Sequence, residues 1–78
     1  MRIKTPVDLS EAIRGARRRR RMTQRDLALI AGTGERFIVE LEAGKPTIRL
    51  GHVLAVMAAL GLEMTIEDSE HDAKAPVA

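Results

Sequence analysis

The chain has 78 residues, a formal net charge of +2, no cysteine and a single aromatic side chain. A chain of this length forms one small domain with a marginally stable core, and without disulfides or a cluster of metal ligands we expect dimerisation to supply further stability. The sequence has neither an apolar run long enough to span a bilayer nor a signal-peptide pattern, so we expect a cytoplasmic protein with no membrane partner.

Charge is distributed unevenly along the chain. Residues 1–49 contain twelve Lys and Arg against six Asp and Glu, a net charge of +6. Residues 50–78 contain one Lys against five Asp and Glu, a net charge of −4. The basic first half predicts a polyanionic partner, and the acidic second half predicts a different role for the C-terminal part of the chain.

Capping residues, apolar spacing and glycines predict four helices. Thr5 and Thr23 are each followed three residues later by Asp, a pairing that satisfies the free amides at a helix start. Apolar side chains then recur at helical spacing, and glycines mark the helix ends. The predicted helices cover about residues 6–20, 24–31, 35–44 and 50–61. In the last of them, the side chains expected to face the core are Leu50, Val53, Leu54, Met57 and Leu60.

The period of the pattern changes after the fourth helix. Residues 62–67 alternate apolar and polar side chains, which predicts a short β-strand. A lone strand cannot satisfy its own backbone groups, so it needs a partner, either the same strand of a second chain or the segment 2–4. Residues 68–78 are predicted to form a disordered tail. The residues expected to serve dimerisation are Leu62, Met64 and Ile66.

The two middle helices and the turn between them form a predicted helix-turn-helix motif. Ala28 is small where the helices cross, Gly32 permits the positive φ of a tight turn, and Ile38 and Leu41 fill the crossing. Two ordinary helices of a bundle are the alternative, which a Gly-x-Gly sequence alone would not exclude. The whole run favours the helix-turn-helix, from the capping threonine and glutamine through the glycine turn to Ile-x-x-Leu-Glu-x-Gly-Lys at fixed offsets.

This run resembles the lambda-repressor-like, or Xre-type, helix-turn-helix family. The residues that carry the resemblance are Thr23, Gln24, Leu27, Ala28, Ala31, Gly32, Ile38, Leu41, Glu42, Gly44 and Lys45. The flanking residues 3–13 and 45–66 further resemble HipB-type antitoxins, which are repressors that partner HipA-like kinase toxins. The resemblance implies an all-α, four-helix domain over residues 1–67, whose short C-terminal strand completes a sheet between the subunits of a homodimer.

The same resemblance implies two macromolecular partners besides a second copy of the chain. These are double-stranded operator DNA and a HipA-like kinase toxin. A stand-alone Xre-type regulator is the alternative, because such regulators share most of these sequence features.

The resemblance assigns base contacts to the start of the third helix. Glu35, Arg36 and Glu40 match positions that read bases in the major groove. Arg36 is the strongest candidate because a guanidinium pairs bidentately with guanine. The acids Glu35 and Glu40 either accept from cytosine, pair with a neighbouring arginine, or remain solvated. Gly34 stands among these positions where the family often has a capping serine, so a hydroxyl contact is lost there.

The resemblance also implies contacts to the phosphate backbone. Gln24 lies at the amino end of the second helix, where free amides and the helix dipole favour a phosphate to which its carboxamide can also donate. A solvated side chain is the alternative. Arg21 stands where the family often has glycine, so the sequence does not determine at which residue the first helix ends. The residues assigned to phosphate are Gln24, Thr33, Arg21, Lys45 and Arg49.

The five consecutive residues Arg17 to Arg21 are not five DNA contacts, because successive residues of a helix point in different directions. The resemblance pairs Arg17 with Glu42 as a structural bridge, and Arg18 is expected to face solvent. Phe37, the one aromatic residue, is expected to pack in the core, with contact to a thymine methyl as the alternative.

The sequence indicates no catalytic, metal or cofactor site. His52 and His71 have no second ligand at metal spacing, and neither a nucleophile–base pair nor a glycine-rich phosphate loop is present. We therefore expect a binding protein, not an enzyme, and no cofactor. A helix-turn-helix used only for protein contact is the competing class, which the acids of the third helix favour and the arginine density disfavours. RNA binding fits less well because exposed aromatic side chains are lacking.

Overall fold

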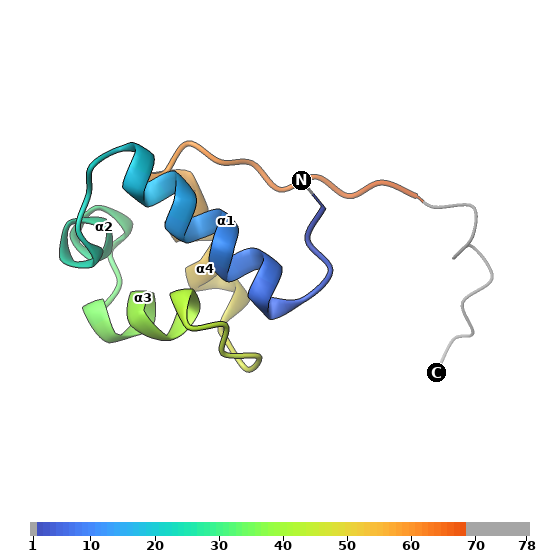
Figure 1. The fold of residues 1–78 in the computed structure, drawn as a ribbon, viewed down its shortest axis with the longest axis horizontal. Coiled ribbons are helices and arrows are strands. Elements are labelled where there is room, and N and C mark those ends of the chain that lie inside the picture. The colour runs from blue at the N-terminus through green and yellow to red at the C-terminus, as the bar shows by residue number, and fades with distance from the viewer. Residues whose placement is uncertain (1, 69–78) are drawn as a thin grey trace.

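The computed structural model describes residues 2–68, which contain four α-helices (Figure 1). They are α1 (Pro6–Arg19), α2 (Gln24–Ala31), α3 (Glu35–Glu42) and α4 (Leu50–Ala59). In this arrangement α2 packs against both α3 and α4, and α1 packs against α3. The expected four-helix, all-α architecture is confirmed, and each predicted helix end lies within two residues of the observed one.

Local hydrogen bonds explain where the first two helices begin. The Thr5 hydroxyl accepts from the Asp8 amide at 3.0 Å, and the Asp8 carboxylate accepts from the Thr5 amide at 3.1 Å. Thr23 and Asp26 repeat this reciprocal arrangement, with both distances at 3.0 Å. Hydrogen bonding to Thr23, first through its backbone amide, lowers the pKa of the Asp26 carboxyl below its ordinary value. Each pair thus satisfies amides that the helix itself leaves free.

Two left-handed residues set the turns around α2. Gly32 has φ +75° at the C-terminal end of α2, a conformation that a glycine adopts without steric cost. Arg21 has φ +56° in the turn between α1 and α2, although it carries a side chain. Left-handed backbone costs a non-glycine residue on the order of 1 kcal/mol. The unusual arginine in this turn therefore ends α1 at some expense of stability.

The core lies where α2 and α3 cross and α1 and α4 cover them. Ala28, Ile38 and Leu41 are all buried, as the helix-turn-helix pattern predicts. Phe37 packs against the edge of this core and lies 5.2 Å from the His52 ring, measured between ring centroids. The buried apolar residues are Ile13, Ala16, Leu27, Ala28, Ile38, Leu41, Val53, Val56, Met57 and Leu60.

Two of the predicted core positions of α4 are wrong. Leu50 and Leu54 are exposed, whereas Val56, which the sequence analysis did not place inside, is fully buried. The inward face of α4 follows Val53, Val56, Met57 and Leu60, so Leu54 lies on a neighbouring side of the helix. An almost wholly apolar helix offers several possible faces, and packing against α2 selects one of them.

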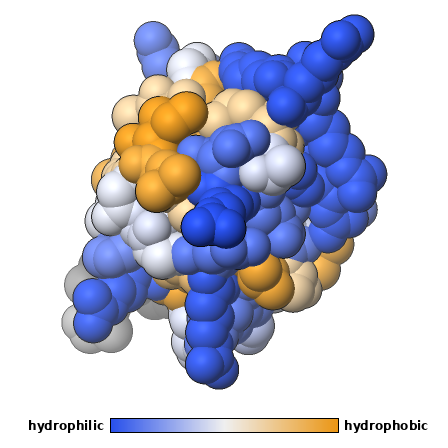
Figure 2. All heavy atoms as spheres, turned by 90° about the vertical axis from the view of Figure 1, so that its left-hand side faces the viewer, coloured by the Kyte–Doolittle hydropathy of each residue, from blue (hydrophilic) through white to orange (hydrophobic). Residues whose placement is uncertain are grey.

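The α2 surface also exposes apolar side chains. Leu29 is 74% exposed and Ile30 is 64% exposed. Figure 2 views the molecule from the side on which α2 lies, and hydrophobic side chains gather there among charged ones. A short helix that packs one narrow face against α3 and α4 leaves these residues in solvent.

The predicted C-terminal strand is absent from the single chain over the described residues. Residues 62–68 pass beside α1 and then leave the helical domain in an extended conformation without strand pairing (Figure 1). Leu62 is half-buried against the core, Met64 is exposed, and Ile66 is 92% exposed. A strand requires a neighbour for its backbone groups, and a lone chain provides none here. Except for Asp68, the predicted disordered tail, which includes His71, lies outside the described residues.

Candidate nucleic-acid interface

One side of α3 projects from the domain and forms the surface that we call the exposed ridge. It consists of Glu35, Arg36, Val39, Glu40 and Ala43, which recur at helical spacing. The opposite side of α3 is buried in the core. The Arg36 side chain is 91% exposed, the largest exposed fraction among the ion-paired side chains of the described residues. The geometry therefore offers a single helix face, about two turns long, to an external partner.

Ion pairs organise the charged side chains of the exposed ridge. The Glu40 carboxylate lies 3.5 Å from Nε of Arg36, one turn earlier on the helix. It also lies 3.3 Å from Nζ of Lys45, in the loop that follows α3. Glu40 thus pairs with neighbouring cations in the free protein, which is one of the alternatives that the sequence left open. Exposed pairs of this kind exchange readily with solvent or with a ligand because each contributes little energy.

Beneath the ridge, a buried ion pair holds α3 against α1. Glu42 is 3% exposed, and its carboxylate accepts from Nε and Nη2 of Arg17 at 2.7 and 2.9 Å. These hydrogen bonds raise the pKa of the Arg17 guanidinium above its ordinary value. Arg17 also donates to the backbone carbonyl of Met22 at 2.8 Å, which ties the turn before α2 into the same group. A bidentate pair fixes orientation as well as distance, so it sets how α3 projects.

Gln24, the first residue of α2, belongs to this group as well. Its Nε2 donates to Oε1 of Glu42 at 3.2 Å. A carboxamide nitrogen carries two hydrogens, so one remains available for a further acceptor. Gln24 is therefore oriented by Glu42 at the amino end of α2, where unpaired amides and the helix dipole favour an anion.

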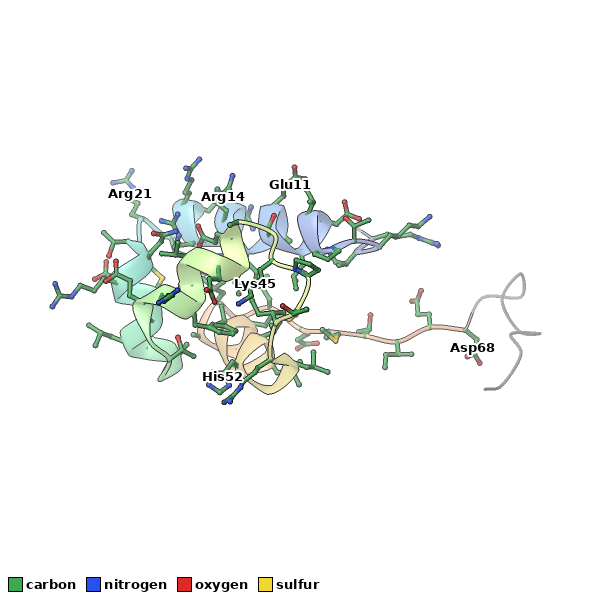
Figure 3. The ribbon with its side chains drawn as sticks, turned by 90° about the horizontal axis from the view of Figure 1, so that it is seen from below. Glu11, Arg14, Arg21, Lys45, His52 and Asp68 are labelled. Carbon is green, nitrogen blue, oxygen red and sulfur yellow. The ribbon has the colours of Figure 1, made fainter. Side chains whose placement is uncertain are left out.

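The other four predicted phosphate residues lie in the three segments that connect the helices of the domain. Arg21 projects from the turn before α2, and Lys45 follows α3 (Figure 3). Arg49 is exposed at the start of α4. Thr33 is half-buried, and its hydroxyl donates to the Gly34 carbonyl at 3.3 Å. The predicted set is thus spread over the perimeter of the ridge.

Gly34 begins α3 without a side-chain cap. Its backbone lies in the extended region, and a Cβ placed on it would meet no atom within 4 Å. The position therefore has room for a side chain such as the serine that the resemblance leads one to expect there. A glycine leaves the first amides of α3 open to solvent or to a ligand.

Sequence reasoning missed three residues near this surface. Val39 is exposed on the ridge between Arg36 and Glu40, and helical spacing could have identified it. Arg14 donates to the Glu42 backbone carbonyl, and Figure 3 shows it beside the C-terminal end of α3. Arg18 lies four residues after Arg14 on α1; it is exposed, as expected, and it also lines the same hollow as Gln24 and Val39. No local signal distinguishes these two arginines from their neighbours.

Comparison with known proteins assigns this arrangement to a family. A family model described as Helix-turn-helix matches residues 13–66 of the chain. The chain belongs to the Xre-type helix-turn-helix family. It is 49% identical over 65 residues to the uncharacterized HTH-type transcriptional regulator y4mF of Sinorhizobium fredii, an alignment that covers 83% of this chain and 86% of that protein.

Solved structures of HipB are similar to this Xre-type domain. The chain matches one from a HipB-O4 20mer complex with a TM-score of 0.81 and 26% identity, over 90% of this chain and 99% of the other. A chain of the HipA-HipB-O2-O3 complex matches with the same score, identity and coverage. The resemblance to HipB-type proteins predicted from the sequence is therefore confirmed at the level of structure.

These findings make the Xre-type chain a helix-turn-helix transcriptional regulator. Within residues 2–68 no cluster of three His, Cys, Asp or Glu side chains is placed to hold a metal ion. The helices of that same part of the chain are too short or too polar to cross a membrane.

Proposed function

We propose that this regulator is a sequence-specific DNA-binding repressor that acts as a cytoplasmic homodimer. The observation that carries the proposal is the exposed ridge of α3, held rigidly by the buried Arg17–Glu42 pair and bordered by cations. A helix presented in this way fits the major groove, which admits one α-helix. Two ridges in a symmetric dimer would meet half-sites about one helical turn (~34 Å) apart.

Within the ridge, Arg36 is the proposed base-reading residue. Its side chain is exposed, and among residues 2–68 its one ion-pair partner is Glu40. On DNA the guanidinium would exchange this partner for the O6 and N7 acceptors of guanine. Glu35, Gly34 and Glu40 border the same base edges, and Val39 would contact a thymine methyl. Glu40 also pairs with both Arg36 and Lys45, so it links the proposed base-reading residue to a proposed phosphate contact.

Phosphate contacts would fix the register of the ridge without reading sequence. Gln24 is proposed to donate its second amide hydrogen to a phosphate at the amino end of α2, while the first stays on Glu42. The proposed further contacts come from Thr33, Arg21, Lys45 and Arg49. Such contacts make affinity strongly dependent on salt.

The C-terminal segment supports a dimer. Leu62, Met64 and Ile66 alternate with polar residues and are extended, and Ile66 is almost fully exposed. A copy of this strand from a second chain would pair its backbone groups and cover these side chains in a sheet between subunits. The segment 2–4, which carries the exposed Ile3, could join the same sheet.

The regulator is further proposed to be the antitoxin of a HipA-like kinase module that represses its own operon. The likeness to HipB supports this proposal, because one of the similar solved structures is a HipA-HipB-O2-O3 complex. Co-purification of a kinase-like protein encoded by a neighbouring gene would support the subclass. An isolated gene whose product purifies alone would leave a stand-alone Xre-type repressor.

A helix-turn-helix that binds only protein is the second candidate function. The exposed apolar pair Leu29 and Ile30 and the acids Glu35 and Glu40 favour it. Titration of a palindromic fragment of the regulator's own promoter at several salt concentrations distinguishes the two. The DNA-binding proposal requires preference over a scrambled duplex and affinity that falls steeply with salt. Equal or salt-independent binding to both duplexes would contradict sequence-specific DNA binding, and binding to neither duplex would leave the protein-only function.

A further inference from the structure

A polar hollow of about 330 Å³ opens between α1 and α3, beside the first residue of α2. Gln24 is the one phosphate contact proposed above that lines this hollow. Its walls come from three different helices, which the fold brings together and the sequence separates by up to 29 positions. The residues around it include Arg14, Arg17 and Arg18 of α1, Gln24 of α2, and Glu42 and Ala43 at the end of α3.

The hollow carries a surplus of positive charge. Three guanidinium groups line it against the single carboxylate of Glu42, a net charge of +2. Glu42 is already engaged by the bidentate contact from Arg17. The Arg14 guanidinium lies 3.9 Å from that carboxylate, and its side chain is 41% exposed. Within residues 2–68 the Arg18 side chain makes neither a hydrogen bond nor an ion pair. Two cations are therefore left to attract an external anion.

The hollow also has hydrogen-bond donors at its edges. Gln24 retains one amide hydrogen, and it stands at the amino end of α2, where backbone amides are unpaired. Arg14 uses Nη2 on the Glu42 carbonyl and keeps other donors of its planar fork free. Guanidinium groups match the oxygens of a phosphate geometrically, which an ammonium cannot do. The chemistry of the walls thus fits an oxyanion such as a phosphate.

The position of the hollow identifies the source of that phosphate. Val39 and Ala43 form one wall of the hollow and also belong to the exposed ridge. A duplex whose major groove receives the ridge has its sugar–phosphate backbone along the rim of that groove, next to α3. We propose that the hollow binds one backbone phosphate of the DNA in each subunit, with Arg14 and Arg18 as its charged ligands. This inference rests on the proposed DNA-binding function and extends its contact surface to α1.

The test is the salt dependence of binding by an Arg14→Gln/Arg18→Gln variant. Glutamine removes both charges but retains a donor at position 14 near the Glu42 carbonyl. Loss of one phosphate contact per subunit reduces the slope of log affinity against log salt by about 1.8 for the dimer. The ratio of wild-type to variant affinity then changes about twelvefold between about 50 and 200 mM salt. The preference for operator over a scrambled duplex stays unchanged, because phosphates carry no sequence information.

The matched control is Arg19→Gln/Arg20→Gln, which removes the same charge at the C-terminal end of α1. Arg19 faces a different hollow, lined also by Met57, Leu62 and Glu63, and Arg20 donates to the Ala16 carbonyl. If the two double variants have the same slope of log affinity against log salt, the inference about the hollow is overturned. The DNA-binding function is still upheld in that case, provided that the wild type binds the operator. A wild-type chain that binds no duplex would overturn both. If the Arg14 change unfolds the domain, the salt dependence of Arg18→Gln is compared with that of Arg19→Gln. Equal slopes of log affinity against log salt again contradict phosphate binding in the hollow.

Discussion

The buried Arg17–Glu42 pair provides the sharpest test of how this domain presents α3. Glu42→Ala would leave the Arg17 guanidinium without its carboxylate, although the Arg17 side chain is only 11% exposed. Removing one partner of a buried pair costs about 3–5 kcal/mol. A domain of 78 residues has a free energy of unfolding of about 4–12 kcal/mol, so the loss is a large part of the total.

Thermal and urea denaturation followed by circular dichroism would measure this loss. At about 4–8 °C per kcal/mol for a domain of this size, the Tm falls by at least about 12 °C. Glu40→Ala is the control, because it removes an equally charged side chain from exposed pairs and costs less than about 1 kcal/mol. A Glu42→Ala variant that loses no more than the Glu40→Ala variant would refute the structural role of the buried pair.

A hydrophobic replacement separates stability from function at the same site. Arg17→Met/Glu42→Leu fills similar volume without charge, and such replacements often regain the stability lost by breaking a buried pair. Gln24 nevertheless loses the carboxylate that orients it. We therefore expect the double variant to fold but to bind DNA more weakly than the wild type. A double-mutant cycle then gives the coupling energy of the pair directly.

Three further predictions follow from individual contacts. Arg36→Ala should cost roughly 1–3 kcal/mol at one base pair and abolish preference there, measured by binding to operators substituted position by position. Arg21→Gly should raise the free energy of unfolding in urea by up to about 1 kcal/mol, because it relieves left-handed backbone. Asp26 should stabilise the fold above its unfolded pKa of about 3.9 and lose that contribution as pH falls through its lower folded value, so Asp26→Asn should flatten the stability profile in acid.

Each of these has a specific contradicting result. Uniform weakening of Arg36→Ala on every operator would place the side chain on phosphate. Arg21→Ala keeps the left-handed requirement, so equal stability of the Ala and Gly variants would show that the backbone is unstrained. An Asp26→Asn profile parallel to that of the wild type below pH ~4 would show that the hydrogen bonds of Thr23 do not favour the charged carboxylate.

The run of arginines shows where sequence reasoning reached its limit. Arg17 lies in a buried pair, Arg18 borders the polar hollow, Arg19 faces another side of α1, and Arg20 donates back to the Ala16 carbonyl. Arg21 lies beyond the end of α1, in the turn with left-handed backbone. The rotation of about 100° per residue predicts that neighbours diverge, but the packing of other helices decides what each one meets.

Local chemistry is what the sequence by itself determined. Reciprocal Thr–Asp hydrogen bonds begin α1 and α2, and Gly32 permits the tight turn of the motif, because these effects act over a few residues. Apolar periodicity likewise predicted most of the core. Where local signals are weak, as in the nearly all-apolar α4, the predicted face was partly wrong.

The resemblance implied the pairing of Arg17 with Glu42, but only the tertiary structure showed which further polar side chains join that pair. Glu42 gathers Arg14, Arg17 and Gln24 from two other helices, and only this convergence orients Gln24 and creates the hollow beside α3. The predicted strand over residues 62–67 is a different case, because a strand requires a neighbour for its backbone groups and residues 2–68 of one chain pair none with it. Contacts between residues far apart in sequence depend on how the helices cross, and that crossing results from the packing of the whole core.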